Sequence, residues 1–247
     1  MKEQGRIFYS SDPFIGGTVE SGKIEFEAAK EILIPNFDVC FLSGESGAGK
    51  STYGKKLAEK LGIRIRDIGD EIRNKTTEQT GEVSVGFAAR KIDVDIEFDK
   101  LIVDIIRNSI IEGPIILVAR MGPWIAKKEE AIARENYLFF PNVVSINFSA
   151  SPKVKRDRIR IRERIKHPEM TIHQIDCRTF LGNKKNQENW HLAHPDLVGN
   201  PLDPLAQYDG RDIYNIKVNN DGLDANQNYL KTNEELIKEN YLLKKAA

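Results

Sequence analysis

The stretch GESGAGKST, from Gly44 to Thr52, decides the fold of this chain. It fits the pattern G-x-x-x-x-G-K-[ST] at Gly44, Gly49, Lys50 and Ser51. The apolar run VCFL at residues 39–42 precedes the stretch and predicts a buried strand. The run KKLAEKL at residues 55–61 follows it and predicts an amphipathic helix that ends at Gly62. Strand, glycine-rich loop and helix in this order are the context in which the pattern binds phosphate.

The residue types in this stretch suit a nucleoside triphosphate. Small residues let backbone N–H groups curl around phosphates, and the start of the following helix adds a positive dipole end. Lys50 would reach the terminal phosphates of ATP, and the hydroxyl of Ser51 would bind Mg²⁺. A glycine-rich turn without a ligand is the alternative interpretation. The expected ATP-binding residues are Gly44, Ser46, Gly47, Ala48, Gly49, Lys50, Ser51 and Thr52.

Composition argues against several classes of protein. Lys plus Arg and Asp plus Glu both number 37, so the formal net charge is zero and nucleic acid is not an expected partner. No apolar run approaches the ~18 residues of a membrane span, so we expect no membrane association. Residues 1–6 lack the apolar core of a signal peptide, and Cys40 and Cys177 make no disulfide framework. We therefore expect a cytoplasmic protein, whose oligomeric state the sequence leaves open.

The rest of the chain alternates predicted strands with predicted helices. Further strands are expected at residues 63–67, 115–118, 142–148 and 214–218. Further helices are expected from residue 71 onward and at residues 87–109, 153–166 and 228–243. This order predicts an α/β fold with three αβα layers around a central parallel sheet. Ligands of such a fold bind at the carboxyl ends of the strands.

Arginines that follow the later strands suggest phosphoryl transfer to a second anion. Two anions repel each other, so their approach requires cations, and catalysis rests on positioning and charge stabilisation. Arg158 and Arg162 lie one helical turn apart and could clamp one anion. Arg73 and Arg120 are isolated, and such arginines more often form surface ion pairs. A phosphate acceptor needs no general base, and no kinase-type catalytic Asp motif is visible in the sequence.

Five segments follow one another in the order seen in cytidylate kinases, and the chain resembles the short archaeal-type members. The segments are Gly44–Thr52, Gly69–Arg73, Val94–Asp99, Val118–Trp124 and Val154–Glu163. The resemblance implies phosphorylation of a small nucleotide, CMP or dCMP, with ATP and Mg²⁺ as cofactors. By position it implies three acceptor-site residues, Asp70, Arg73 and Arg120. It also implies that Arg158 and Arg162 belong to a lid and act in catalysis together with Lys50.

The chain departs from this family at several positions. Members usually have an acidic residue and a glycine before the arginine after the third strand, where this chain has Val118 and Ala119. A carboxylate beside Mg²⁺ is thereby lost, so either Asp67 or Asp70 substitutes for it or activity is reduced. Glu45 stands where proline is usual, and its charge is unfavourable beside a triphosphate unless the side chain points outward.

We expect an N-terminal extension over residues 1–37, with a short helix at 26–34, and a kinase domain over residues 38–247. The domain would carry a lid insertion at about residues 152–212, which includes a polar segment from residue 167 onward. Within that segment, Asn183 and Asn186 stand where acidic residues are common in the family. Two other functions stay open. One is a kinase for another small molecule or a nucleic-acid end, and the other is a nucleotide-binding regulatory protein with little catalysis.

Four residues of the polar segment allow a separate hypothesis. His173 and Cys177 are four positions apart, and His191 and His194 are three apart. Together they could form a four-ligand Zn²⁺ site that holds the lid. Unrelated polar residues on surface helices are the alternative interpretation.

Overall fold

In a computed structural model, the structure describes residues 19–20, 23–24, 32–80 and 92–245. The chain divides into two compact units. The first comprises Met1–Ile32 and Lys244–Ala247, and its described part includes the antiparallel pair β1 (Val19–Glu20) and β2 (Lys23–Ile24). The second unit, Leu33–Leu243, contains the phosphate loop and the elements described below.

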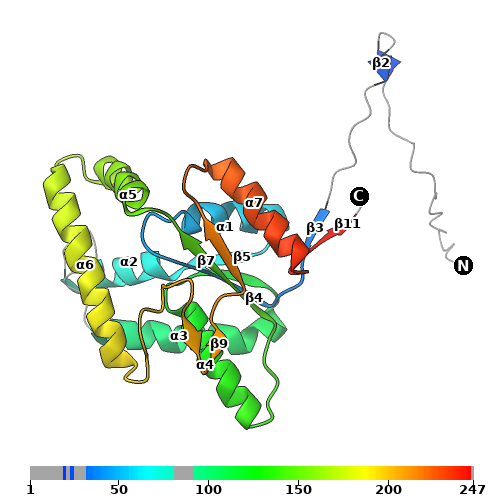
Figure 1. The fold of residues 1–247 in the computed structure, drawn as a ribbon, viewed down its shortest axis with the longest axis horizontal. Coiled ribbons are helices and arrows are strands. Elements are labelled where there is room, and N and C mark those ends of the chain that lie inside the picture. The colour runs from blue at the N-terminus through cyan, green and yellow to red at the C-terminus, as the bar shows by residue number, and fades with distance from the viewer. Residues whose placement is uncertain (1–18, 21–22, 25–31, 81–91, 246–247) are drawn as a thin grey trace, which may run out of the picture. The chain divides into compact units, whose positions relative to one another are not determined.

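A five-stranded parallel sheet forms the centre of the second unit (Figure 1). Its strands are β4 (Val39–Ser43), β5 (Arg64–Asp67), β6 (Ile115–Val118), β7 (Val143–Ser149) and β10 (Ile216–Asn219). The strand order is β10-β7-β4-β6-β5, so β4 is central. The chain first adds β5 and β6 on one side of β4 and then crosses to add β7 and β10 on the other. The topological switch point therefore lies at the carboxyl end of β4, where open α/β sheets bind their ligands.

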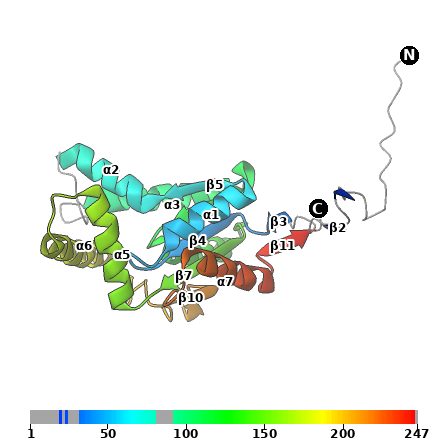
Figure 2. The same cartoon turned by 90° about the horizontal axis from the view of Figure 1, so that it is seen from above.

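Helices cover both faces of the sheet, as the predicted three layers require. One face carries α1 (Lys50–Leu61) and α7 (Ala225–Lys238), which lie in front of the strands in Figure 2. The other face carries α2 (Ile68–Thr80), α3 (Ile92–Glu112) and α4 (Gly122–Glu135). Because side chains alternate along a strand, Cys40 and Leu42 pack toward the first pair of helices and Phe41 packs toward the second group. The predicted fold class is confirmed.

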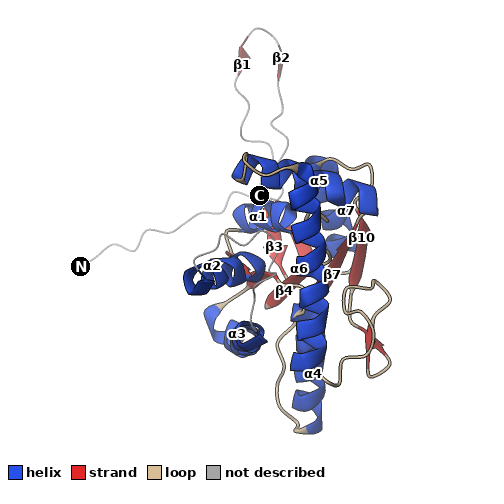
Figure 3. Cartoon of the chain, turned by 90° about the vertical axis from the view of Figure 1, so that its left-hand side faces the viewer, coloured by secondary structure: helices blue, strands red, loops and turns tan. Residues whose placement is uncertain are grey.

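Two helices follow β7 in the predicted lid region. The first, α5 (Pro152–Lys166), was expected, and Pro152 stands at its start. The second, α6 (Ile172–Ala193), occupies part of the polar segment for which the sequence predicted no long helix. Seen from the side in Figure 3, α6 crosses in front of the strands, and it packs against α3 and α5. A short antiparallel pair, β8 (Gln207–Tyr208) and β9 (Arg211–Asp212), precedes β10.

Two expectations near the chain ends were wrong. Residues 32–34 were expected in a helix but lie in β3 (Ile32–Pro35), which pairs with β11 (Leu242–Lys245). The rest of that expected helix, residues 26–31, falls outside the described residues. The closing helix ends at Lys238 rather than at residue 243, because Asn240 adopts a left-handed conformation with φ of 60° and turns the chain into β11.

Candidate nucleotide-binding site

The phosphate loop joins the carboxyl end of β4 to the start of α1. Gly44, Gly47 and Gly49 have φ values of 128°, 80° and 95°, a region that side chains other than glycine rarely adopt. A Cβ atom at Gly44 would collide with the carbonyl oxygen of Phe148, and one at Gly47 would lie 2.6 Å from the carbonyl oxygen of Lys155. The glycines are therefore required by close backbone packing as well as by the turn of the loop.

Lys50 lies at the start of α1 with its side chain over the loop. Its Nζ donates a hydrogen bond to the carbonyl oxygen of Glu45 at 2.8 Å. Burial in the site lowers the pKa of Lys50 to about 7, and the charge of Arg120 acts in the same direction, while Asp67 opposes both. An anion in the loop would stabilise the charged ammonium, so the environment of Lys50 suits a phosphate ligand.

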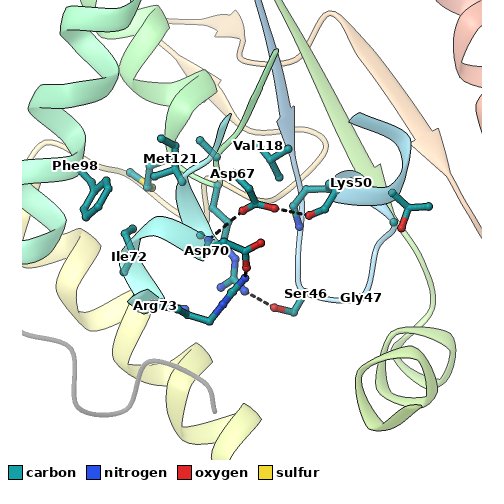
Figure 4. A pocket seen from close by; sticks show the side chains of 18 of the residues that line it. Ser46, Gly47, Lys50, Asp67, Asp70, Ile72, Arg73, Phe98, Val118 and Met121 are labelled. Atoms are coloured by element: carbon teal, nitrogen blue, oxygen red, sulfur yellow. Dashed lines mark hydrogen bonds and ion pairs between the residues drawn. The ribbon is translucent and has the colours of Figure 1, made fainter. Parts of the chain in front are cut away.

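Ser51 donates a hydrogen bond from Oγ to Oδ2 of Asp67 at 2.7 Å. The other carboxylate oxygen of Asp67 accepts the backbone N–H of Asp70 at 3.2 Å, which fixes the side chain between α2 and the loop (Figure 4). Hydroxyl and carboxylate oxygens are the ligand types that Mg²⁺ prefers. Ser51 and Asp67 therefore fit a Mg²⁺ ion beside the loop, whereas the carboxylate of Asp70 forms an ion pair with Arg73.

Glu45 does not line the cavity beside the loop. Its exposed side chain forms an ion pair with Lys155 of α5. The acidic residue at the usual proline position is therefore turned away from the phosphate site and partly neutralised by the lid region.

The cavity has a volume of about 790 Å³ and runs from the phosphate loop to α3 and α6. Figure 4 shows Ser46 and Gly47 at one side, with Ile72, Phe98 and Met121 gathered at the other. The cavity is thus charged and polar beside the loop and largely apolar at the far side. This shape suits a ligand that has an anionic group at one end and a flat or apolar body at the other.

Most of the residues that the sequence singled out line this cavity. The ones that line it are Ser46, Gly47, Gly49, Lys50, Ser51, Thr52, Asp70, Arg73, Arg120, Arg158 and Arg162. Gly44 and Ala48 do not line it, because both are buried within the loop. The residues selected from the sequence therefore lie around one cavity, while the role of each residue stays a prediction.

The predicted arginines contact different parts of the site. Arg120 donates to the hydroxyl of Ser46 in the loop and, from Nη1, to Oδ1 of Asn183 in α6 at 3.4 Å. Arg158 donates to three carbonyl oxygens, each at 3.3 Å, which belong to Gly47, Asn220 and Leu223.

Arg162 forms an ion pair with its neighbour Glu163 at 2.6 Å. Although Arg158 and Arg162 both line the cavity, only Arg158 contacts the phosphate loop in this structure. Their joint clamping of one anion stays a prediction.

Several residues that line the cavity were not predicted as site residues from the sequence. Asp95 and Asp99 come from α3, and Asn186 and Trp190 come from α6. Helix α6 begins with a capping box, in which the side chains of Thr171 and Gln174 bond to each other's backbone N–H groups. The pattern T-x-x-Q was the sequence signal that could have predicted this helix.

The zinc hypothesis is wrong for the described part of the chain. Cys177 Sγ and His173 Nε2 lie 3.6 Å apart, but His194 instead bonds to Oδ2 of Asp99 at 2.9 Å. Among the residues that the structure describes, no group of three or more His, Cys, Asp or Glu side chains is placed to hold a metal ion. Cys40 and Cys177 are both free thiols.

A parallel sheet with a phosphate loop at its switch point and helices on both faces is the arrangement of a P-loop protein. A family model for shikimate kinase matches residues 46–86. The sequence is 34% identical to the cytidylate kinase of Ignicoccus hospitalis over 92 residues, which cover 36% of this chain and 50% of that protein. The predicted resemblance to cytidylate kinases is confirmed, and the match spans half the length of that relative.

Two further similar proteins are a curated relative and a solved structure. The cytidylate kinase of Methanocorpusculum labreanum is 26% identical over 141 residues, 55% of this chain and 71% of that protein. The solved shikimate kinase from Acinetobacter baumannii in complex with shikimate is 12% identical, with a TM-score of 0.43 over 83% of this chain and 96% of that one. Within the described part of the chain, no helix combines the length and the apolar character that crossing a membrane requires.

Proposed function

We propose that the chain transfers the γ-phosphoryl group of ATP to a nucleoside monophosphate, with CMP or dCMP as the preferred acceptor. The observation that carries the proposal is one cavity that joins the phosphate loop to four arginines and an apolar far side. The similarity to cytidylate kinases supports the choice of acceptor. We also propose the cytoplasm as the compartment of the reaction.

Different residues of the site would bind the ATP phosphates and the acceptor phosphate. The backbone N–H groups of residues 47–51 would hold the ATP phosphates. Lys50 would stabilise the negative charge of the γ-phosphoryl group during its transfer. Ser51 and Asp67 would hold Mg²⁺, which neutralises negative charge on the phosphate oxygens when it is bound. Asp70 and Arg73 would lie on the acceptor side, where the guanidinium binds the acceptor phosphate.

Arg120, Arg158 and Arg162 would complete the charge stabilisation. Arg120 already bridges the loop and α6, so it could bind an acceptor phosphate without a large movement. Arg158 and Arg162 would turn toward the transferring group when the lid closes over it. An acceptor phosphate is already a nucleophilic anion at neutral pH, so the reaction needs no general base.

An acceptor panel tests the proposal. The full chain is incubated with ATP, Mg²⁺ and one of CMP, dCMP, UMP, AMP or shikimate, and the phosphorylated product is identified by mass. We expect transfer to CMP or dCMP and loss of that transfer in Lys50→Ala. Lys60→Ala, an exposed lysine in the last turn of the same helix, is the matched control and should keep the wild-type rate.

A second candidate is a kinase for a small hydroxylated acid, and the shikimate kinase match over residues 46–86 favours it. A hydroxyl acceptor has to lose its proton during transfer, so a carboxylate near the reacting groups would be needed as the base. Asp67 and Asp70 both line the cavity. Transfer to shikimate without transfer to any monophosphate would establish this candidate and refute the first.

A further inference from the structure

Asn186 is a buried polar residue that no part of the phosphoryl-transfer mechanism uses. It lies on α6, its residue surface is 2% exposed, and it lines the cavity. Its Oδ1 atom is buried and has no hydrogen-bond partner among the described residues. Buried polar atoms in native proteins are nearly always paired, so an unpaired carbonyl in a cavity wall indicates a partner supplied by a ligand.

Helix α6 places Asn186 between the two ends of the cavity. One turn before it, Asn183 accepts a hydrogen bond from Arg120, which also contacts the phosphate loop. One turn after it, Trp190 is buried in the cluster that contains Phe98. Since one helical turn rises about 5.4 Å, Asn186 stands between the arginine that would bind the acceptor phosphate and the apolar far side. It is therefore placed beside the body of an acceptor rather than beside its phosphate.

The neighbouring cavity wall also offers hydrogen-bond acceptors. Asp95 of α3 is 4% exposed, and its Oδ2 accepts a hydrogen bond from Nδ2 of Asn189 at 2.7 Å. Asp99, one turn later on α3, bonds to His194. Carboxylates from α3 and the amide carbonyl of α6 thus line one cavity together with Phe98 and Trp190. Such a wall favours a ligand that carries hydrogen-bond donors on a flat or apolar body.

We propose that Oδ1 of Asn186 accepts a hydrogen bond from the body of the acceptor molecule and thereby selects acceptors that present an N–H or O–H donor there. The inference rests on the proposed function, because it assumes that the acceptor occupies this cavity. In a nucleotide, an exocyclic amino group supplies the donor, whereas a ring carbonyl at the same position would face Oδ1 with like partial charge. In a small acid, a hydroxyl group supplies it.

Binding tests the inference separately from catalysis. The affinities of the full chain for CMP, UMP and shikimate are measured by calorimetry with Mg²⁺ and a non-hydrolysable ATP analogue present. CMP and UMP differ at C4, which carries an amino group in CMP and a carbonyl in UMP, and at the adjacent N3, which accepts a hydrogen bond in CMP and donates one in UMP. For the wild type we expect CMP to bind on the order of tenfold more tightly than UMP, the effect of one neutral hydrogen bond gained against one repelled. Tighter binding of shikimate than of either nucleotide would identify the donor as a hydroxyl.

Variants at position 186 test whether the side-chain amide of Asn186 causes the preference for CMP over UMP. Asn186→Leu and Asn186→Ala should each weaken the preferred probe and bring CMP and UMP to similar affinities. Gln187→Leu and Gln187→Ala are matched controls, because Gln187 is the next residue of α6 but is exposed and does not line the cavity. The two substitutions differ in volume, and unfolding midpoints show which variants remain folded.

Each of the following results either supports or overturns the proposed role of Asn186. A preference for UMP would overturn the inference that an exocyclic amino group donates to Asn186, because UMP has a carbonyl at that position. Unchanged affinity in a folded variant, or no binding of any probe to the wild type at millimolar concentration, would also overturn it. Binding of CMP that depends on Asn186, without any phosphoryl transfer, would support the inference while refuting the proposed function.

Discussion

Asp67 and Val118 are register partners on the adjacent strands β5 and β6, and Asp67 accepts the 2.7 Å hydrogen bond from Ser51. Val118 occupies the position at which cytidylate kinases usually carry an acidic residue. Partners in neighbouring parallel strands project to the same side of the sheet, so the carboxylate beside the loop comes from the next strand instead. This placement supports the interpretation that Asp67, rather than Asp70, compensates for Val118.

Exchanging the two residues tests this compensation. Asp67→Asn should lower turnover by ~10²-fold at saturating ATP, because it removes a charge beside the metal in a charge-crowded transition state. The double variant Asp67→Val with Val118→Asp should recover part of that loss relative to Asp67→Val alone. Steady-state rates over a range of Mg²⁺ concentrations measure both effects. Full activity in Asp67→Asn would show that the carboxylate has no part in holding the metal.

Lys50→Ala should lose ~10²-fold or more in turnover, because it removes a cation whose Nζ lies 2.8 Å from the carbonyl oxygen of Glu45 in the loop. The measurement is the initial rate with ATP and the best acceptor from the panel. Lys60→Ala controls for the loss of a lysine from α1. A near-normal rate for Lys50→Ala would contradict the assignment of the site.

Two glycine substitutions separate backbone strain from steric collision. Gly62→Ala introduces a side chain at a φ of 65° with open space around it, so it should cost about 1 kcal/mol of unfolding free energy. Gly47→Ala introduces similar strain and also places a Cβ 2.6 Å from the carbonyl oxygen of Lys155, so it should cost more and weaken ATP binding. Denaturant unfolding and nucleotide titration measure both effects. Equal costs at the two positions would show that α5 does not pack against the loop.

The ion pair between Glu45 and Lys155 should influence nucleotide binding more than folding. Both groups are near the surface, so removing the pair should change the unfolding free energy by less than about 1 kcal/mol. Lys155→Ala leaves the charge of Glu45 unopposed at the edge of the phosphate loop and should weaken ATP binding several-fold at low salt. The double variant Glu45→Gln with Lys155→Ala should restore the affinity. An affinity for ATP that is the same in all three proteins would indicate that the pair lies too far from the phosphates to matter.

The sequence predicted those parts of the fold whose signal is local. The apolar run of β4, the turn of the glycine-rich loop and the end of α1 at Gly62 are signalled by residues adjacent in the sequence, and the structure has them as expected. Two helices were missed for different reasons. In α4 the start is marked by Pro123, which suits a first helical turn, but the sequence-based prediction included this stretch only as a segment of the family resemblance. In α6 most apolar residues are exposed, so their spacing in the sequence produced only a weak helical periodicity.

The site required information that no single stretch contains. The arginines were recognisable because charge in a phosphate site is chemically obligatory. Asp67 was one of two candidates, and only the pairing of β5 with β6 separates it from Asp70. Asn186 could not be singled out as an acceptor-facing residue, because its burial depends on the packing of α6 against α3.

Arg158 joins segments that are more than 60 positions apart in the chain, because its guanidinium donates to Gly47 in the loop and to Asn220 and Leu223 after β10. A movement of α5 away from the nucleotide would have to break all three contacts together. The side chain of Arg158 therefore links the phosphate loop, helix α5 of the predicted lid and the turn after β10. A displacement of any one of these segments will strain its hydrogen bonds to the others.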